Sequence, residues 1–591
     1  AASDVYKRQM LNGHPKGLFV LAATNTGERF GYYTMLAIFT LYLQAHYGWS
    51  SAATSQVFGI FLAAVYFLPV IGGIVADKFL GYGKTITLGT IVMFLGYALL
   101  AFPIGSGAIP MFIALGFIAL GTGFFKGNLQ VLVGNLYDNP KYSKNRDLAY
   151  SIFYMCINIG AFFAPSMAEA ISNYILKGAG MVYNSKIPAL AHQLFDGTIA
   201  PGSAGYEELV NLATAQGASI TDLSSLQQFA HTYIDTLSQS YQYGFGVACI
   251  SLIASLAIFA GFRKYYKSAD ATEKEKAQGK GDKDAVVLEL TKEQTRERVI
   301  ALILVFIVVI FFWMSFHQNG LTMTFFARDY TTSHISGISS LLFSLSGTVP
   351  FILLFYGLFL LFTGDKKTKP IGGIMAAVFA VVLYFVYQKN FAGHQTDYTP
   401  QIFQQFNPMF IIILTPIFVG LFSWLSSKKK EPSAPRKIGI GMIIAALGFV
   451  ILLVGSLGLT APSDLASHPL SESQMVSPYW LINTYLVLTC AELFLSPMGI
   501  SFVSKVSPPK YKGMMQGLWF AATAVGNYLT SVIGYLWEKV SLPVLWGILI
   551  ICCALSALFI FSIMKRLERV TRESEEQLKA AEEAHKKKEK K

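Results

Sequence analysis

Four ionisable side chains stand inside long apolar runs of this sequence, where a charge is costly. Glu28 and Arg29 are adjacent in TNTGERFGYY, Lys126 lies in GTGFFKGN, and Glu492 lies in AELFLSP. A charge near the centre of a bilayer costs about 2.5–3.5 kcal/mol on insertion scales, and such residues are usually paired and functional. Two acids and two bases sum to zero, as a shared polar cavity inside a membrane requires. His317 adds an imidazole, whose charge can change near neutral pH.

The residues around the Glu-Arg pair repeat at the spacing of an α-helix. Residues three and four apart lie on one face of a helix, and this face contains Asn25, Glu28, Arg29, Tyr32, Tyr33 and Leu36. Gly27 and Gly31 fall on another side and form a small-xxx-small pair, which lets a second helix approach closely. The pattern predicts a helix that turns polar groups toward an interior and packs tightly elsewhere. A structural ion pair that only holds helices together is the alternative.

Lys126 has surroundings that also suit a helix interior. It is flanked by Gly121, Gly123 and Gly127, which allow its helix to cross close to another. A lysine that snorkels to the membrane surface is the alternative. Four charges on three predicted helices, accompanied by tyrosines and asparagines, favour a polar binding cavity inside the membrane.

The elements that position these charges are predicted to be membrane-spanning helices. Of 591 residues, 53% are hydrophobic and only 14% are charged. Apolar runs of roughly twenty residues, the length that crosses a bilayer as a helix, recur through the chain, whereas a β-barrel would show short alternating segments. The sequence predicts an all-α polytopic membrane protein with fourteen transmembrane helices. The predicted spans are 17–44, 54–75, 85–103, 109–134, 149–174, 241–262, 299–323, 337–363, 369–388, 402–426, 437–460, 477–503, 513–536 and 543–564.

Charges in the connections orient the predicted spans. Lysine and arginine concentrate in alternate loops, such as RKYYKSADATEKEKAQGKGDKD and SSKKKEPSAPRK, and in the C-terminal tail. By the positive-inside rule these loops and both termini are cytoplasmic. The expected location of the chain is a bacterial cell (inner) membrane. The longest opposite connection, 175–239, holds two lysines and five acids. The basic cytoplasmic loops that orient the protein in the membrane therefore account for the net charge of +12, and no nucleic acid partner is predicted.

The spans divide the chain into five parts. They are a cytoplasmic N-terminus (1–16), an N-terminal six-helix bundle (17–262), a charged cytoplasmic linker (263–298), a C-terminal bundle (299–564) and a charged cytoplasmic tail (565–591). Short amphipathic helices are predicted within the outward loop, at ELVNLATA and SLQQFAHTYIDTLSQ. The linker is predicted to be partly helical, and the tail a charged helix or a disordered segment. The polar start AASDVYKRQM does not read as a cleaved signal; it resembles a translated adapter, with the native start expected at Met10.

Catalysis and bound cofactors have no support in the residue pattern. HExxH and Walker A motifs are absent, and no GxSxG falls in a plausible strand–helix turn. The chain is therefore predicted not to be an enzyme, and no cofactor or metal is expected. The cysteines all fall inside apolar runs, so no disulfide framework is predicted; they are Cys156, Cys249, Cys490, Cys552 and Cys553.

Several motifs resemble those of a known transporter family. The loop GGIVADKFLGYGKT resembles the loop motif of the major facilitator superfamily, and Asp77 and Gly81 within it fit the first signature of its proton-coupled oligopeptide transporter family. YSIFYMCINIGAF, with Asn158, fits the second signature. Further matches are FNPMFIIILTP with Asn407, AELFLSPMGISFVSKVSP with Glu492, and MMQGLWFAATAVGN with Trp519. The matches run over nearly the whole chain.

The resemblance implies a transporter that moves di- and tripeptides into the cell with protons. Two six-helix bundles would alternate access to one site, and the functional unit would be a monomer in the lipid bilayer. Arg29 and Lys126 would face the peptide's carboxylate, and Glu492 would receive its amino group with Asn158 and Asn407. The pocket would also be lined by Tyr32, Tyr33, Tyr66, Trp519 and Thr523. The charge pattern agrees, because a zwitterion about two residues long needs a cation at one end and an anion at the other.

Proton coupling is where the sequence departs from the family pattern. Asn25, expected with Asp77 and Gly81 to have a gating or structural role, stands where the family's first-helix motif begins with glutamate. His317 stands where the family usually has an acid, and Leu36 replaces a second basic residue. Coupling is expected at Glu28, Arg29, His317 and Glu492, and we hypothesise that Glu28 and His317 together take over protonation. A neutral, hydrogen-bonding His317 is the alternative.

Fourteen spans exceed the twelve that the family fold implies. Aligning NPMFIIILTP to the eighth family helix leaves 337–388 as an extra transmembrane hairpin inserted in the second half. The hairpin is expected at the periphery of the bundle, outside the transport path.

Other functions remain open from the sequence. One is a family relative that carries nitrate or a modified amino acid, or that works as an exchanger. Another is a non-transporting peptide sensor that signals through the linker or the tail. A membrane-embedded enzyme is the weakest alternative, because no catalytic set is found.

Overall fold

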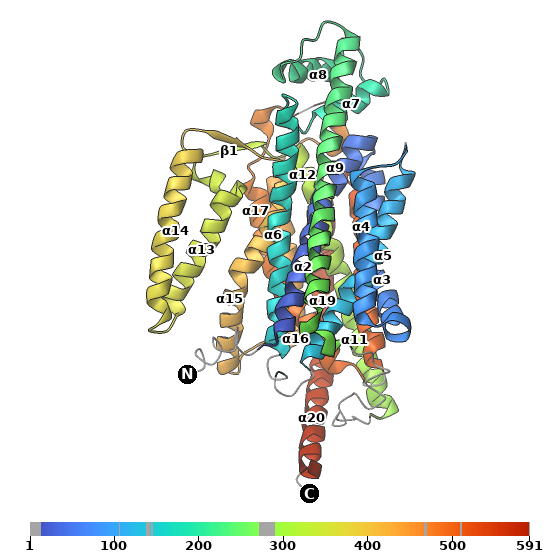
Figure 1. Cartoon of the computed structure of the whole chain (residues 1–591), viewed down its shortest axis with the longest axis vertical. Helices are drawn as coiled ribbons and strands as arrows, with labels where there is room; N and C mark the ends of the chain where they lie inside the picture. The colour runs from blue at the N-terminus through green and yellow to red at the C-terminus, as the bar shows by residue number, and fades with distance from the viewer. Residues whose placement is uncertain are drawn as a thin grey trace.

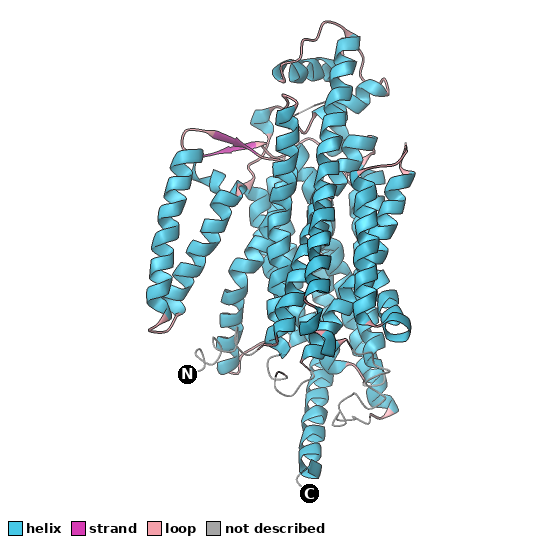
Figure 2. Ribbon diagram, viewed as in Figure 1, coloured by secondary structure: helices cyan, strands magenta, loops and turns pink. Residues whose placement is uncertain are grey.

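The structure, a computed structural model, is helical over most of its length. It describes residues 14–105, 107–137, 142, 146–270, 290–465, 468, 470–508 and 511–589, with the side chains at 146–148, 496–501, 504–505, 512–513, 516 and 578–589 left undescribed. Figure 2 shows helices throughout and one small sheet. In that sheet β1 (His334–Ser336) pairs antiparallel with β2 (Gln395–Asp397).

Two runs of helices form the molecule. The N-terminal half (14–270) contains α2 (Lys16–Tyr47), α3 (Ser51–Val75), α4 (Tyr82–Ala101), α5 (Ile109–Leu136), α6 (Arg146–Gly178), α7 (Ile187–Phe195), α8 (Ala204–Ala215) and α9 (Leu223–Gly261). The C-terminal half (290–589) contains α11 (Lys292–Phe316), α12 (Thr322–Asp329), α13 (Leu345–Thr363), α14 (Thr368–Asn390), α15 (Phe406–Ser427), α16 (Ala434–Gly455), α17 (Tyr479–Val506), α18 (Lys512–Tyr535), α19 (Leu542–Ser562) and α20 (Met564–Glu589).

The molecule has two distinct ends. Figure 1 shows α7 and α8 at one end, here called the outer end, and α20 projecting from the other, here called the inner end. The long helices run between these ends. This arrangement agrees with a loop 175–239 and a C-terminal tail on opposite sides of the membrane.

Eleven helices of the described residues are long and apolar enough to cross a membrane by length and composition alone. The predicted number was fourteen, and long helices do occupy all fourteen predicted positions. The three outside the eleven are α2, α17 and α18, and α17 contributes a shorter apolar helix at Tyr479–Leu495. α2 carries Glu28 and Arg29, and most of its residues are buried. A helix wrapped by protein can be less apolar than one that faces lipid, and composition alone therefore does not identify it.

Several boundaries differ from the predicted ones. α9 is 39 residues long, about 58 Å at the rise of an α-helix, so the predicted loop helix at SLQQFAHTYIDTLSQ and the span 241–262 form one continuous helix. ELVNLATA lies in α8 as predicted, whereas α7 was not anticipated. The start of α9 is fixed by a capping box in which Asp222 accepts from the backbone N of Ser225 at 2.8 Å. This bond holds the pKa of Asp222 below its usual value.

Some predicted spans are interrupted by short 3-10 helices. The span 337–363 begins with η7 (Gly337–Phe343) before α13, and the span 402–426 begins within η8 (Pro400–Gln405) before α15. The span 299–323 ends its α-helix at Phe316, where η6 (His317–Gly320) separates α11 from α12. These breaks were not predicted from hydropathy.

Glycines bring the helices of the N-terminal half into close contact, as their spacing predicted. A Cβ on Gly27 would lie 2.4 Å from Ser255 Oγ, and one on Gly31 would lie 2.5 Å from Ser251 Oγ, both on α9. A Cβ on Gly123 of α5 would lie 2.7 Å from the Cβ of Leu68 on α3. Larger residues at these positions would push the helices apart, and with them the charged groups that they carry.

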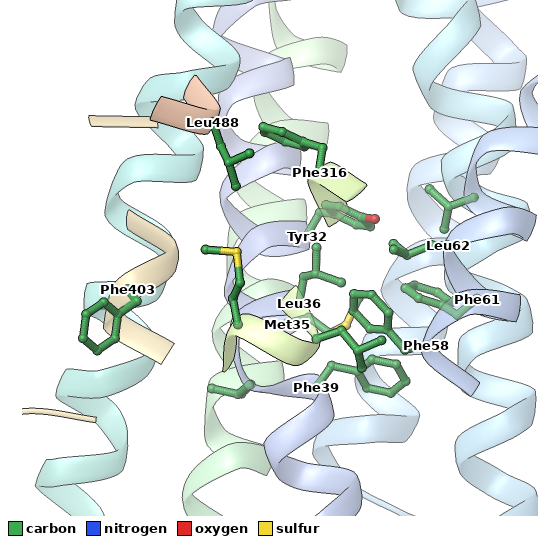
Figure 3. Close-up of a cluster of buried hydrophobic side chains, with 14 of the residues drawn as sticks. Tyr32, Met35, Leu36, Phe39, Phe58, Phe61, Leu62, Phe316, Phe403 and Leu488 are labelled. Atoms are coloured by element: carbon green, nitrogen blue, oxygen red, sulfur yellow. The ribbon is translucent and has the colours of Figure 1, made fainter. Parts of the chain in front are cut away.

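An apolar cluster fills the space between α2 and α3 on the outer side of the charged residues. Figure 3 shows Met35, Leu36 and Phe39 of α2 near Phe58, Phe61 and Leu62 of α3. The rings of Phe39 and Phe61 lie 5.6 Å apart. Phe58 also meets the C-terminal half, because a Cβ on Gly320 would lie 2.9 Å from its ring. The cluster therefore belongs to the seam between the two halves.

The hairpin of α13 and α14 stands at the edge of the bundle (Figure 1). Its two helices cross closely at Gly357 and Gly372, where an added Cβ would lie 2.6 Å from a backbone nitrogen of the partner helix. Only Gly372 and Ala376 of α14 are buried. The peripheral position expected for 337–388 is thus observed, and the outer face of α14 is apolar, as a lipid-facing helix should be.

The structure describes part of the linker and most of the tail. Within the linker, Asp270 accepts from the backbone N of Gly83 at 2.8 Å and forms an ion pair with Arg263 at 3.6 Å; residues 271–289 lie outside the described part. The tail is helical, as one of the two predictions had it. Its Arg566 pairs with Glu297 of α11 at 2.9 Å, which ties α20 to the inner end of the C-terminal half.

Candidate functional site

Glu28 and Arg29 form a buried ion pair on α2. Arg29 Nε donates to Glu28 Oε2 at 2.5 Å, and Nη2 donates to Oε1 at 2.7 Å, while the residues are only 1% and 4% exposed. The Arg29 guanidinium also lies 4.8 Å from the ring centre of Tyr32. Two parallel bonds between a guanidinium and a carboxylate are strong and directional. Both charges are thereby satisfied without a second helix, and either becomes available when the other is neutralised.

Lys126 points at an aromatic ring rather than toward a membrane surface. Its Nζ lies 3.7 Å from the ring centre of Tyr66 on α3, a geometry that stabilises a desolvated cation. The lysine also interacts electrostatically with Arg29 and Glu28. This contact differs from the alternative in which Lys126 reaches toward the membrane surface.

His317 lies next to this cation at the break between α11 and α12. Its ring is 6.0 Å from that of Tyr66 and stacks on Trp313 at 5.1 Å. Its Nδ1 is buried and has no hydrogen-bond partner among the described residues. An unpartnered ring nitrogen in this position can take up a proton or accept a bond from a ligand or water.

Glu492 of α17 receives hydrogen bonds from both halves of the molecule. Tyr154 Oη of α6 donates to Oε1 at 3.2 Å, and Asn407 Nδ2 of α15 donates to Oε2 at 2.9 Å. Asn407 Nδ2 also contacts Thr489 Oγ1 at 3.0 Å. The carboxylate is 6% exposed, so these neutral donors replace water around it.

Two predicted site residues bond to their own helices, and a third packs against a neighbouring helix. Asn158 Nδ2 donates to the Tyr154 backbone oxygen at 3.0 Å, so its amide nitrogen does not reach Glu492 directly. Thr523 Oγ1 donates to the Trp519 backbone oxygen at 3.1 Å. Trp519 is buried, with its ring 6.0 Å from that of Phe306. These residues lie on helices of the site, and their contacts in this structure are structural ones.

Tyr33 links the two charged groups. Its ring packs edge-on against Tyr32 at 5.3 Å, and its phenol interacts electrostatically with Arg29 and with Glu492. The arginine, the lysine and the carboxylate therefore gather around a common set of tyrosines contributed by α2, α3 and α6. The convergence that the sequence predicted is present, with cations on the side of α2 and α5 and an anion on the side of α17.

The predicted gating or structural residues fall into two groups. Asp77 lies at the inner end in the π-helical turn η1 (Ala76–Leu80), where it accepts from Tyr82 Oη at 2.6 Å. Gly81 follows with a φ of 78°, a conformation that favours glycine. Asn25 is buried on α2, one turn before Glu28, and its Nδ2 has no partner among the described residues.

Sequence reasoning missed another buried carboxylate, Glu169 of α6. It is 8% exposed and accepts from Thr399 of the C-terminal half, through the backbone N at 2.7 Å and Oγ1 at 3.0 Å. One turn earlier, Ser166 Oγ donates to Gln405 Oε1 at 2.6 Å. The presence of an acidic residue within the apolar run SMAEAISN could have indicated this site in the sequence.

Further bonds between the halves also lie toward the outer end. Arg328 of α12, which pairs with Asp329 at 2.5 Å, hydrogen-bonds Gln44 of α2. The backbone N of Ser51 donates to Glu538 at 3.1 Å, and Lys186 Nζ donates to the Leu470 backbone oxygen at 2.7 Å. The hydrogen bonds named here between the two halves lie at the level of Glu492 or on its outer side. These bonds close the contact between the two halves toward the outer end, which is here called the outer seam.

A cavity of about 580 Å³ lies within this outer seam. Its walls include Trp49 of the N-terminal half, Lys186 and His192 of the loop 175–239, and Arg328 of the C-terminal half. Neither Arg29, Lys126 nor Glu492 lines it. The cavity is therefore an outer vestibule, separate from the charged site.

Comparisons with known proteins agree with the architecture. The model of the POT family matches residues 83–192 and 392–545. The chain is similar to the peptide transporter YePEPT of Yersinia enterocolitica, with 27% identity over 544 residues covering 88% of each chain. It is also similar to the di-/tripeptide transporter of Lactococcus lactis subsp. cremoris, with 26% identity over 550 residues, covering 88% of this chain and 89% of that one.

Solved structures show the same fold. A crystal structure of peptide transporter POT in complex with sulfate aligns with a TM-score of 0.62 at 23% identity, covering 95% of this chain and 96% of that one. A crystal structure of a POT family transporter in complex with 5-aminolevulinic acid aligns with a TM-score of 0.64 at 19% identity, covering 94% and 98%.

Proposed function

Because this chain belongs to the POT family, whose members are multi-pass membrane transporters and not enzymes, we propose that it carries di- and tripeptides into the cell together with protons. Fourteen membrane spans form two six-helix bundles plus the peripheral hairpin of α13 and α14, in a monomer. Both termini face the cytoplasm of a bacterial cell, and the inner end is the cytoplasmic end.

The observation that carries the proposal is the separation of charge across one site. Arg29 and Lys126 supply positive charge from α2 and α5, and Glu492 supplies negative charge from α17, with tyrosines between them. A short peptide has a carboxylate at one end and an ammonium at the other, whatever its side chains are. A site that binds these common ends and leaves the side chains against apolar walls accepts many peptides.

The closed outer seam supports alternating access. Hydrogen bonds join the halves at the level of Glu492 and on its outer side. The structure is therefore interpreted as a state in which the site is shut off from the outside. Opening to the outside requires the bonds of the outer seam to break.

Proton coupling is proposed to act through the Glu28–Arg29 pair. Protonation of Glu28 removes its charge, weakens both bonds to Arg29, and frees the guanidinium for the carboxylate of a peptide. Loss of the proton inside the cell lets the pair form again and displaces the peptide. His317, beside Lys126 and Tyr66, is proposed to share this role.

One proton supplies enough free energy for useful accumulation. A charge that moves down 100 mV gains about 2.3 kcal/mol. At about 1.4 kcal/mol per tenfold ratio, this supports a peptide gradient of roughly forty-fold.

Uptake into proteoliposomes tests the proposal. With a pH gradient, inside alkaline, Ala-Ala uptake is expected in the wild type and is expected to lose its dependence on the gradient in Glu28→Gln. Counterflow with Ala-Ala, alanine, 5-aminolevulinic acid and nitrate identifies the substrate class. Gradient-driven uptake that persists in full in Glu28→Gln would contradict the coupling role. Peptide binding without any uptake would instead favour the sensor alternative.

A further inference from the structure

Glu169 occupies a special position at the seam between the two halves. It lies on α6 eleven residues beyond Asn158, about 16 Å toward the outer end at the rise of an α-helix. The two donors that hydrogen-bond it, the backbone N and Oγ1 of Thr399, belong to the segment that leads into η8 of the C-terminal half. The carboxylate is thus buried by one half and bonded by the other.

The surroundings of Glu169 contain no opposite charge. Its own helix packs against α2, α9, η8 and α15, and no Lys, Arg or His of the described residues forms an ion pair with it. The titratable group that interacts with it is the phenol of Tyr398, next to Thr399. The neighbouring seam contact is the neutral bond from Ser166 to Gln405. Burying a carboxylate without a cation is costly unless hydrogen bonds replace the lost water.

Opening the outer seam changes this environment completely. When the halves separate there, Glu169 loses both bonds from Thr399 and meets water. The free energy of its ionised form relative to its protonated form therefore differs between the closed and the open seam. A group whose proton affinity differs between two states must, by linkage, shift the balance of those states when it binds a proton.

We propose that Glu169 is a proton-binding site that links protonation to opening of the outer seam. The proposal rests on the alternating-access cycle of the proposed function, and it concerns a carboxylate separate from the central site. Glu169 acts as a positioning residue, because it does not touch the peptide and exerts its effect through Thr399.

Seam opening can be measured without any peptide. Thr40 of α2 is fully buried in the outer seam, 3.4 Å from the Gly320 backbone oxygen. A Thr40→Cys variant in right-side-out proteoliposomes reacts with a membrane-impermeant maleimide only when the seam opens. Rates between pH 5.5 and 7.5 are normalised to those of Glu207→Cys, an exposed position on α8, which corrects for the pH dependence of the thiol. Labelling of the native cysteines is measured in the unsubstituted chain and subtracted.

The proposal predicts a normalised rate for Thr40→Cys that changes at least threefold over this pH range. Adding Glu169→Gln is expected to abolish that change, because the amide oxygen still accepts from Thr399 but the side chain no longer binds a proton. Ser166→Ala is the matched control: it removes a seam bond one turn away without removing a titratable group, so the pH dependence remains. Thr399→Val, which removes only the Oγ1 donor, is expected to shift the midpoint and serves if Glu169→Gln does not fold.

A rate that is independent of pH in Thr40→Cys, or an unchanged pH dependence in Glu169→Gln, overturns the proposal. The assay contains no peptide, so failure of peptide uptake in the counterflow experiment does not decide it. Conversely, an unchanged pH dependence of labelling in Glu169→Gln together with intact proton-driven uptake would overturn the role of Glu169 as the link while leaving the proposed transport function in place.

Discussion

Glu492 supplies the negative charge of the site, and its carboxylate accepts hydrogen bonds from the uncharged side chains of Tyr154 and Asn407. A variant that removes only this charge therefore tests the role of Glu492. In Glu492→Gln, Tyr154 can still donate to the amide oxygen, so the local packing is kept while the charge is lost. Removing one member of a buried charge pair costs about 2–5 kcal/mol, so the affinity for Ala-Ala is expected to fall on the order of 30-fold or more. Isothermal titration with the purified protein measures the change.

Thr489→Val provides the control at the same place. It removes the hydroxyl that contacts Asn407 Nδ2 at 3.0 Å but leaves the Glu492 charge, so a loss of less than about fivefold is expected. Equal losses in the two variants would show that the packing around Asn407, rather than the carboxylate charge, governs binding.

Individual charges could be predicted from the sequence because burial in a membrane is costly for each of them wherever the chain folds. Glu28, Arg29, Lys126 and Glu492 were found in this way. Their partners could not be predicted, because Tyr66, Tyr154 and Asn407 come from helices far apart in the sequence. Glu169 escaped notice for the same reason: an acid near the outer third of a span is compatible with the membrane surface, and only Thr399, 230 residues away, shows that it is buried.

Helix positions are set by close backbone contacts, and two adjacent glycines of α3 test this. A Cβ on Gly72 would lie 2.1 Å from the Gly123 backbone oxygen on α5, whereas a Cβ on Gly73 would meet nothing within 4 Å. Gly72→Ala must therefore move α3 away from α5, at a cost of about 1–3 kcal/mol, and should displace Tyr66 from Lys126.

The expected result is a lower unfolding temperature and weaker Ala-Ala uptake in Gly72→Ala. Thermal unfolding followed by size-exclusion chromatography in detergent, together with the uptake assay, measures both effects. Gly73→Ala should behave like the wild type or be slightly more stable, since alanine is favoured over glycine in a helix interior. The same loss of stability in both variants would contradict the close-contact explanation.

The elements themselves were largely predictable, and their breaks were not. Apolar length located a helix at every predicted span, because the bilayer fixes that length. The break at His317 and the continuous α9 depend on tertiary packing: η6 lies against α12 and α18, and α9 is extended by contacts with α7 and α8. Hydropathy contains no information about such contacts.

At the scale of the molecule, the hairpin of α13 and α14 and the outer seam differ in what they connect. α13 and α14 contact each other through Gly357 and Gly372. α13 also joins α15, where Tyr356 Oη donates to the Ile412 backbone oxygen at 2.8 Å. Both helices of this contact belong to the C-terminal half, so the hairpin adds area without joining the halves. The outer seam is built from polar bonds between side chains and backbone across the halves. Bonds of this kind break and re-form at low net cost, because water replaces the lost partners, and a surface that opens in every cycle needs this property.

Locking the outer seam tests whether the whole molecule works by alternating access. Ser166 and Gln405 meet across the seam at 2.6 Å, so Ser166→Cys with Gln405→Cys can be joined by a short, reducible bifunctional thiol reagent. Uptake of Ala-Ala into proteoliposomes is expected to fall at least tenfold after joining and to recover on reduction, with each single cysteine variant unaffected by the reagent. Binding of Ala-Ala to the purified, joined protein should stay within about threefold of wild type, because the reagent joins residues that lie outside the central site. Uptake that continues at the normal rate in the joined protein would mean that peptide does not pass through the outer seam, and the two halves would then have to exchange substrate by another route.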